Sequence, residues 1–343
     1  METGARQGTM SGSDFASSKN VPRAASLLSV PRAFACWVGL GGAAQRNDGR
    51  ARILMLHGTP RRRARQLGRL LEYVRRHFQV VPLSVIVADS ASRDVRFRRQ
   101  VALTLDDGLA NNVEVAYPIL RRLGLTATFF VCPGLADAGR WLWNHEARER
   151  LRQLSAAALR ELALQLGAPA DVEGFVDWLK RQPLPGRCSA ESLIRAATPR
   201  FSPSAAQRHD FDIADWEDLR GLDPAVVTLG AHTLTHPILT TLPPAEAERE
   251  ITGSQRVLEA RLQRPVRLFA YPNGDVDRAV HGIVRRYFDG AVSVNEGYVE
   301  PGCDPYMLPR VAFPWSGLRL ARALHRDYER VAPITTSGSQ VAI

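Results

Sequence analysis

Two short segments of this 343-residue chain carry side chains that could do hydrolytic chemistry together. Asp106 and Asp107 are adjacent and precede a glycine. His232 and His236 are four residues apart, a spacing that puts two imidazoles on one side of a helical turn. Two imidazoles and one carboxylate form a donor set that suits zinc and leaves a position open for water. The second aspartate then stays free to act as a base.

Each segment follows a short apolar run. Residues 101–105 precede the aspartates, and residues 226–229 precede the histidines. Such runs are typical of buried parallel strands, and active sites of α/β barrels gather at the carboxyl ends of their strands. We therefore expect both segments at one barrel mouth. An Asp-Gly turn that caps a helix is the alternative interpretation of the aspartates.

The rest of the chain alternates strand-like and helix-like patterns, which predicts an α/β fold with a parallel sheet or barrel. Further strands are expected at 52–56, 79–87, 126–131 and 266–270, and near residues 291 and 308. Helices are expected around 67–74, 113–123, 244–262, 276–287 and 318–331. Residues 139–210 are helical or irregular and interrupt this alternation. We predict a leader over 1–50, one domain over 51–332 with an insertion at about 139–210, and a disordered tail over 333–343.

The motifs resemble those of the polysaccharide deacetylases of carbohydrate esterase family four, which contain a NodB-like homology domain. Residues 104–108 (TLDDG) are similar to the family's T-F-D-D-G motif, and residues 232–236 (HTLTH) fit H-[ST]-x-x-H. Residues 270–274 (AYPNG) correspond to a third motif of the type R-x-P-[YF]-G, and residues 54–57 (LMLH) look like an L-M-Y-H opening strand. With 126–131 and 308–310, the resemblance covers roughly residues 52–330. It implies a distorted (β/α) barrel of about seven strands, to which the pattern over 139–210 adds a helical insertion.

The resemblance also implies roles for single residues. Asp106 corresponds to the general base, and Asp107, His232 and His236 to the ligands of one divalent metal ion, zinc first, with cobalt or nickel as substitutes. By motif position, the backbone N–H of Asn273 would stabilise the oxyanion. The implied activity is metal-dependent removal of N-acetyl groups from amino sugars of a polysaccharide, its precursor or an oligosaccharide.

Two positions depart from the family pattern. Ala270 replaces the arginine that orients the catalytic aspartate in many relatives, and Arg310 is the candidate substitute, with a salt bridge at the barrel rim as the alternative. No clear L-x-H motif supplies a general acid, because His325 falls in the predicted last helix. His57, at the end of a predicted strand, is the candidate acid, and a buried structural histidine is the alternative.

Substrate contacts are expected from Tyr271, Arg310 and Trp143. Aromatic rings stack on sugars, although for Trp143 and Tyr271, as for Trp141 and Trp216, packing in the core is the favoured interpretation. The insertion would carry substrate selectivity if it forms a lid or a groove wall.

Two other functions remain open at this point. The chain could hydrolyse a non-sugar cyclic amide, since relatives with this fold open such rings. It could also be a catalytically silent glycan-binding protein, because the missing motif arginine and general acid weaken two catalytic roles. Retention of Asp106 and of all three predicted ligands argues against the silent protein.

Composition excludes several classes of protein. All but two of the 45 lysines and arginines are arginine, but they are scattered and accompany no nucleic-acid-binding motif. Four widely spaced cysteines suggest neither a disulfide framework nor a zinc knuckle. The apolar run at 33–44 is shorter than the roughly 20 residues of a membrane span.

No signal-peptide pattern opens the chain, so we expect a cytoplasmic protein that acts on a glycan precursor or a lipid-linked sugar. A start at Met10 is the other way to reconcile this feature with a polysaccharide substrate. The sequence indicates no protein partner.

Overall fold

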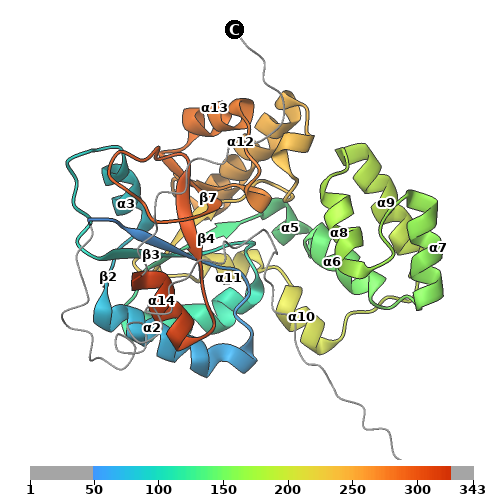
Figure 1. Cartoon of the computed structure of the whole chain (residues 1–343), viewed down its shortest axis with the longest axis horizontal. Coiled ribbons are helices and arrows are strands. Elements are labelled where there is room, and N and C mark those ends of the chain that lie inside the picture. The colour runs from blue at the N-terminus through green and yellow to red at the C-terminus, as the bar shows by residue number, and fades with distance from the viewer. Residues whose placement is uncertain (1–48, 326–343) are drawn as a thin grey trace, which may run out of the picture.

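The computed structural model describes residues 49–325 (Figure 1). The predicted leader, apart from residues 49 and 50, lies outside the described residues, as do Met10, the end of the predicted last helix and the predicted tail.

Seven parallel strands form a closed barrel, which confirms the predicted fold. The ring runs in the order β1-β8-β7-β6-β5-β4-β3 and closes through pairing of β1 with β3. A two-residue strand, β2, pairs in parallel with the first two residues of β3. The strands are β1 (Arg52–Leu56), β2 (Gln79–Val80), β3 (Gln100–Leu105), β4 (Ala127–Val131), β5 (Val227–Ala231), β6 (Leu268–Ala270), β7 (Gly290–Glu296) and β8 (Leu308–Ala312).

Helices surround the barrel and form a lobe beside it (Figure 1). The α-helices are α2 (Ala64–His77), α3 (Leu83–Ser90), α4 (Tyr117–Leu123), α5 (Pro133–Ala138), α6 (Trp143–Leu151), α7 (Ala156–Leu166), α8 (Val172–Lys180), α9 (Leu184–Ala197), α10 (Ala205–Phe211), α11 (Trp216–Arg220), α12 (Pro244–Leu262), α13 (Arg278–Tyr287) and α14 (Gly317–His325). Shorter helical turns are η1 (Arg61–Arg63), η2 (Asn112–Ala116), η3 (Leu239–Thr241) and η4 (Pro272–Gly274).

The strands form because their side chains are buried on both faces. In β1, Leu54 packs in the cluster that includes leucines of α2, whereas Ile53 belongs to a second cluster with Ala102 and Phe130 of neighbouring strands. Both clusters exclude water, so β1, β3 and β4 are nearly continuous buried runs rather than alternating ones. This explains why runs of four or five apolar residues located the strands in the sequence.

The prediction of an extended segment over 79–87 is wrong beyond Val80. The chain turns at Pro82 and forms α3, which contacts both β3 and β7. Ile86 and Val87 belong to the cluster that holds Ile53, so α3 packs on the barrel's inner core. A short apolar run can be a buried strand or a buried helix, and periodicity alone does not separate the two.

The parallel arrangement brings the predicted functional segments to one end of the barrel. Asp106 follows β3, His232 follows β5, and Tyr271 follows β6. His57 follows β1, which lies between β3 and β8, the strand that carries Arg310. Residues more than 200 positions apart in the sequence therefore meet at the carboxyl ends of the strands.

The lobe formed by α6 to α9 lies within the expected insertion and has a core of its own. Its buried residues include Leu162 of α7, Phe175 of α8 and Ile194 of α9. Ile238, which lies just beyond the histidine segment, joins the same core. The lobe therefore packs against the loop that follows β5.

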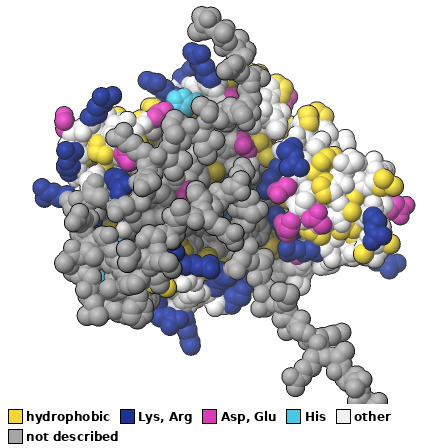
Figure 2. All heavy atoms as spheres, in the orientation of Figure 1, with side chains coloured by type: hydrophobic (Ala, Val, Ile, Leu, Met, Phe, Trp, Pro, Cys, Tyr) yellow, Lys and Arg dark blue, Asp and Glu magenta, His cyan; other side chains and the backbone are white. Residues whose placement is uncertain are grey.

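Helix hydropathy and the charges on one face of the molecule can be described for residues 49–325. None of the helices within residues 49–325 combines the length and the apolarity needed to cross a bilayer. On the face drawn in Figure 2, the described lysine and arginine side chains are spread over the barrel rim and the lobe rather than gathered in one stripe.

Candidate active site

The first motif places two carboxylates in a tight turn after β3. Asp107 has a φ of 77° and Gly108 a φ of +69°, so two successive residues are left-handed. A Cβ on residue 108 would lie 3.1 Å from a methyl group of Val131, so glycine is required there by both conformation and space. The turn makes the two carboxylates face different partners.

Asp106 faces Arg310, which enters from β8. The guanidinium binds the carboxylate through two hydrogen bonds of 2.8 and 2.7 Å. Arg310 also donates to the carbonyl of Ser293 (2.7 Å) and to the hydroxyl of Thr104 (3.1 Å), and it is 1% exposed. Bidentate pairing fixes both the position and the orientation of a carboxylate. Arg310 therefore orients Asp106, although the third motif has Ala270 at the position of its arginine.

Burial and charge act on Asp106 in opposite directions. Burial alone raises the pKa of its carboxyl, but Arg310 and, to a lesser extent, His232 and His57 lower it, and the net pKa lies below the ordinary value. An ionised Asp106 can accept a proton from a water molecule. Its hydrogen bonds to Arg310 leave lone pairs for that step.

Asp107, His232 and His236 converge on one point. Asp107 Oδ1 lies 3.6 Å from His232 Nε2 and 3.5 Å from His236 Nε2, and all three side chains are buried. Tetrahedral bonds of about 2.0–2.1 Å to one zinc ion would hold such donors about 3.4 Å apart. The spacing therefore fits a small divalent cation.

The protonation of these groups also suits a metal. His232 Nδ1 lies 2.7 Å from the carbonyl of Ala270, so Nδ1 carries the proton and Nε2 presents its lone pair to the cluster. Burial, followed by the charge of His232, lowers the pKa of His236 to about 3, which keeps that ring neutral. Burial raises the pKa of Asp107, but His232, His57 and His236 lower it well below the usual range. The set offers Nε2 of His232, a neutral imidazole at His236 and one carboxylate.

Residues 232–236, here called the metal loop, do not form the helical turn that their spacing predicts. Thr233 has a φ of 64° and His236 a φ of 60°. Each non-glycine residue in this region costs about 1–3 kcal/mol. Within the loop, the hydroxyl of Thr233 accepts a hydrogen bond of 3.0 Å from the backbone N–H of His236. The four-residue spacing brings the imidazoles together, with ring centroids 4.9 Å apart, through a bend and not through a helical turn.

Neighbouring elements hold the metal loop in this conformation. Glu250 of α12 accepts hydrogen bonds from the backbone N–H (3.0 Å) and the hydroxyl (2.9 Å) of Thr235. Gly134 of α5 donates its N–H to the carbonyl of Leu234 at 3.0 Å, and a Cβ there would come within 2.9 Å of that oxygen. Cys132 donates to the carbonyl of His232 at 3.0 Å. The loop geometry is thus imposed from outside.

Comparison with known families identifies the chain. Residues 95–165 and 190–287 match the family model described as polysaccharide deacetylase. The chain belongs to the polysaccharide deacetylase family. This membership makes it a hydrolase of carbon–nitrogen bonds other than peptide bonds. The matched residues include both aspartates and both histidines of the site, but neither His57 nor Arg310. No curated protein matches the chain.

Solved structures of deacetylases share the fold at low sequence identity. The deacetylase PplD of Streptococcus pyogenes, in complex with acetate, is 17% identical with a TM-score of 0.52, over 77% of this chain and 92% of that one. IcaB from Ammonifex degensii is 18% identical with a TM-score of 0.55, over 80% and 97%. The BpsB deacetylase domain from Bordetella bronchiseptica is 16% identical with a TM-score of 0.51, over 78% and 97%. At such identities the likeness establishes the fold alone.

The structure places His57 at the edge of this site. Its side chain is exposed, so it is not the buried structural histidine of the alternative interpretation. Its charge lowers the pKa of both Asp106 and Asp107, which puts it within electrostatic reach of both carboxylates. His325, by contrast, lies 3.1 Å from the hydroxyl of Tyr73 on α2. A role for His57 as the general acid stays a prediction.

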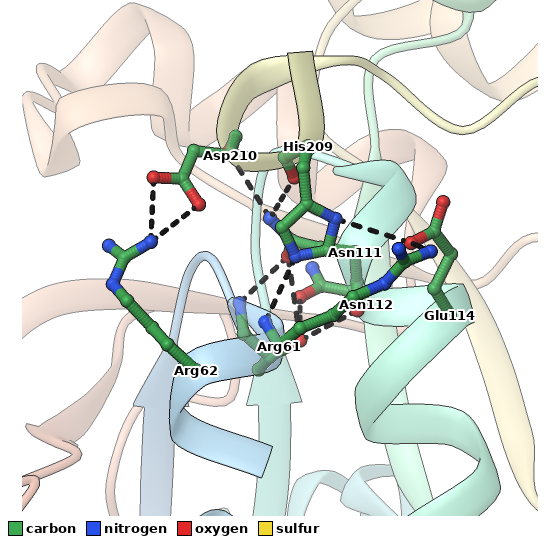
Figure 3. A network of polar contacts seen from close by, with 8 residues as sticks. Arg61, Arg62, Asn111, Asn112, Glu114, His209 and Asp210 are labelled. Atoms are coloured by element: carbon green, nitrogen blue, oxygen red, sulfur yellow. Dashed lines mark hydrogen bonds and ion pairs between the residues drawn. The ribbon is translucent and has the colours of Figure 1, made fainter. Parts of the chain in front are cut away.

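A network of polar contacts fixes the loop that follows His57 (Figure 3). The backbone N–H of Thr59 donates to Asn111 Oδ1 at 2.7 Å, and Asn111 Nδ2 donates to the carbonyl of His209 at 3.0 Å. The imidazole of His209 on α10 in turn accepts the N–H of Arg61 at 2.9 Å. The segment just after the lobe therefore ties the loops after β1 and β3 together.

The third motif supplies fewer contacts than expected. Asn273 is exposed and left-handed, with a φ of 57°, and its side chain donates to Asp275. Its proposed backbone contact to an oxyanion remains untested. Tyr271 is 0% exposed and donates its hydroxyl to the carbonyl of Tyr306 at 2.9 Å. No face of its ring is available to a sugar, so the expected stacking on Tyr271 is wrong.

Trp143 and Arg310 are also enclosed by protein. Trp143 is 8% exposed and donates its indole N–H to the carbonyl of His236 at 2.9 Å. Arg310 has its polar atoms committed to Asp106, Thr104 and Ser293. These contacts replace the predicted contacts of both residues with substrate. Trp141 and Trp216, at 8% and 9% exposed, are likewise packed in the protein.

One buried histidine near the site, His145, is not indicated by any sequence motif. His145 of α6 is 9% exposed, and its Nδ1 has no hydrogen-bond partner among the described residues. Burial lowers its pKa to about 4, although the charge of Asp107 acts to raise it. Its position inside the insertion, away from every motif, is why residue patterns did not single it out.

Proposed function

We propose that this chain removes N-acetyl groups from amino sugars of a polysaccharide, its precursor or an oligosaccharide, with a divalent metal ion held by Asp107, His232 and His236. One observation carries the proposal: a buried cluster of two imidazoles and a carboxylate stands beside a second carboxylate that an arginine orients. Family membership supports the reaction class. Zinc is the ion that this donor set favours, and cobalt and nickel accept the same donors.

The residues divide the chemistry between them. A bound divalent ion lowers the pKa of a coordinated water toward about 7 and polarises the acetyl carbonyl. Asp106, oriented by Arg310, takes the proton of the attacking water. The N–H of Asn273 donates to the oxygen that becomes negative. His57, at the edge of the site, donates a proton to the departing amine. The products are acetate and a free amino sugar.

Arg310 also bears on the alternative of a silent glycan-binding protein. That alternative rested partly on the missing motif arginine at Ala270. Because Arg310 binds Asp106 through both carboxylate oxygens, the base is oriented without the motif residue. The argument for a silent protein is correspondingly weaker.

The test is acetate release from N-acetylglucosamine oligomers by purified protein. The protein is stripped with a chelator and reloaded with zinc or cobalt. Release that returns with the metal and is absent in Asp106→Asn supports the proposal. No release from protein that holds one metal ion per chain would reject these sugar substrates and favour a non-sugar amide.

A further inference from the structure

Trp143 connects the insertion to the metal loop. It is the first residue of α6, and its indole N–H donates to the backbone carbonyl of His236 at 2.9 Å. The Trp143 side chain is buried in the core of the lobe. A residue of the inserted helices therefore binds the backbone of a predicted metal ligand.

His236 depends on such support more than a ligand in a regular element would. Its backbone is left-handed, and the N–H is held only by a side chain of the same loop, that of Thr233. The carbonyl of His236 receives its bond from Trp143. Loss of that bond removes one of the two hydrogen bonds that hold the left-handed backbone of His236, so its imidazole is held less firmly, although Pro237, which follows, limits rotation of the chain.

Trp143 is itself fixed by a second residue of the lobe. The guanidinium of Arg187, on α9, lies 4.4 Å from the centre of a Trp143 ring, and Arg187 is 7% exposed. Arg187 Nε lies 3.1 Å from Glu191 on the same helix. A cation over a buried indole holds the ring against tilting. The contacts thus run from α9 through Trp143 to His236.

We propose that Trp143 is a positioning residue for His236 and that, through Arg187 and Trp143, the inserted lobe sets the affinity of the site for its metal ion. This inference rests on the proposed function in one respect, namely that residues 107, 232 and 236 bind a metal. It does not depend on the substrate. Arg187 lies outside the residues that match the family model, so the outer part of this connection belongs to the chain's own insertion.

The experiment compares two substitutions of the same kind in the same lobe. Trp143→Phe keeps an aromatic ring but removes the N–H that reaches His236. Trp178→Phe is the matched control, because Trp178 of α8 also packs against the lobe's core and, within residues 49–325, makes no hydrogen bond or ring contact with the metal loop. Zinc affinity is measured on the full chain, without substrate, by competition with a chromophoric chelator, and thermal unfolding checks both variants.

We expect the zinc affinity of Trp143→Phe to fall about 10-fold, at the lower end of the effect of losing an outer partner of a metal ligand. Trp178→Phe keeps the affinity of the unmodified chain. The visible spectrum of the cobalt-loaded protein changes in Trp143→Phe and not in Trp178→Phe, because it reports ligand geometry. If Trp143→Phe does not fold, Arg187→Met tests the same connection and is expected to weaken zinc binding a few-fold.

The other outcomes separate this inference from the proposed function. Unchanged zinc affinity in Trp143→Phe, together with a raised KM for the glycan, would overturn the positioning role and restore the stacking role. An unmodified chain that binds no zinc would overturn both. Weakened zinc binding in a chain that releases no acetate would support the positioning role and reject deacetylation of the sugars tested.

Discussion

Asp106 and His236 lie at the same end of the barrel, but different kinds of structure hold them. Asp106 follows β3 directly and is fixed by Arg310, a residue of β8. His236 lies in a left-handed stretch of the metal loop, and its backbone is held by side chains of Thr233 and Trp143. The ion pair of Asp106 and Arg310, here called the Asp–Arg pair, is built on the sheet. The metal loop is built on contacts from outside it.

The difference indicates how each half should respond to mutation. The ladder of backbone hydrogen bonds fixes the geometry of the strands. The Asp–Arg pair should therefore be lost only when one of its two members is changed. The metal loop has several separate supports, from α5, α6, α12 and β4. Loss of one support should weaken metal binding in part and leave the rest in place. The predictions below test this contrast.

The largest expected effect distinguishes the roles of two neighbouring aspartates, Asp106 and Asp107. Asp106→Asn should lower kcat about 10²- to 10⁴-fold, because the general base is lost, while metal binding persists. Asp107→Asn should instead lose the metal, because Asp107 faces both histidines. Bound zinc and acetate release are measured on the same preparations. Turnover largely retained in Asp106→Asn would remove it from the role of base.

The next effect concerns a ligand itself. His232→Ala should weaken zinc binding by more than the roughly 10- to 100-fold that loss of an outer partner costs. The control is His281→Ala, since His281 forms an ion pair of 2.8 Å with Asp304 and does not belong to the metal-ligand cluster. Chelator competition measures both. Equal zinc affinity in the two variants would contradict the assignment of His232 as a ligand.

A smaller effect is expected when the partner of the base is removed. Arg310→Met leaves a buried carboxyl without its cation, so the pKa of Asp106 should rise, since burial then acts with less opposition. The acid limb of kcat/KM should move to higher pH. Breaking a buried pair typically costs about 3–5 kcal/mol of stability.

In Arg310→Met, the contribution of Asp106 to the pH dependence of stability should also change sign. In the unmodified chain the pKa of Asp106 is below its unfolded value, so its contribution grows as pH rises and is lost as pH falls through the folded pKa. In Arg310→Met the folded pKa is raised, and stability should fall as pH rises from the unfolded value toward the folded one. Urea unfolding at several pH values measures this. Arg62→Met, which breaks an exposed pair with Asp210, should change little.

The same contrast explains what the sequence could predict. Apolar runs located the strands because burial on both faces needs such runs, and the closed barrel then placed Asp106 and the metal loop at one end. Pairing of Asp106 with Arg310 was predictable as one of two alternatives, since both lie on or next to strands. Where the backbone is regular, the position of a residue in the sequence predicts its position in the fold.

Contacts made through irregular backbone were not predictable. A spacing of four predicts a helical turn for the metal loop, but hydrogen bonds donated by Gly134 and Trp143 and accepted by Glu250 stabilise a bend with left-handed residues. Gly134 and Trp143 are distant in sequence, Glu250 lies 15 residues beyond Thr235, and none of the three belongs to a motif. The role of Trp143 was not predictable, because the partner of its indole N–H, the carbonyl of His236, comes close only in the folded chain.

The smallest predicted effect tests one support of the metal loop from α12. Glu250→Gln keeps the size of the side chain but removes the charge that strengthens its two hydrogen bonds to Thr235. Because the supports from α5, α6 and β4 remain, zinc affinity should fall by no more than about 10-fold, the lower end for an outer partner. Glu246→Gln on the same helix, whose carboxylate pairs only with Arg249 at 3.5 Å among the described residues, is the control. A loss as large as that of His232→Ala would show that the loop rests on a single contact, and the contrast between the two halves of the site would fail.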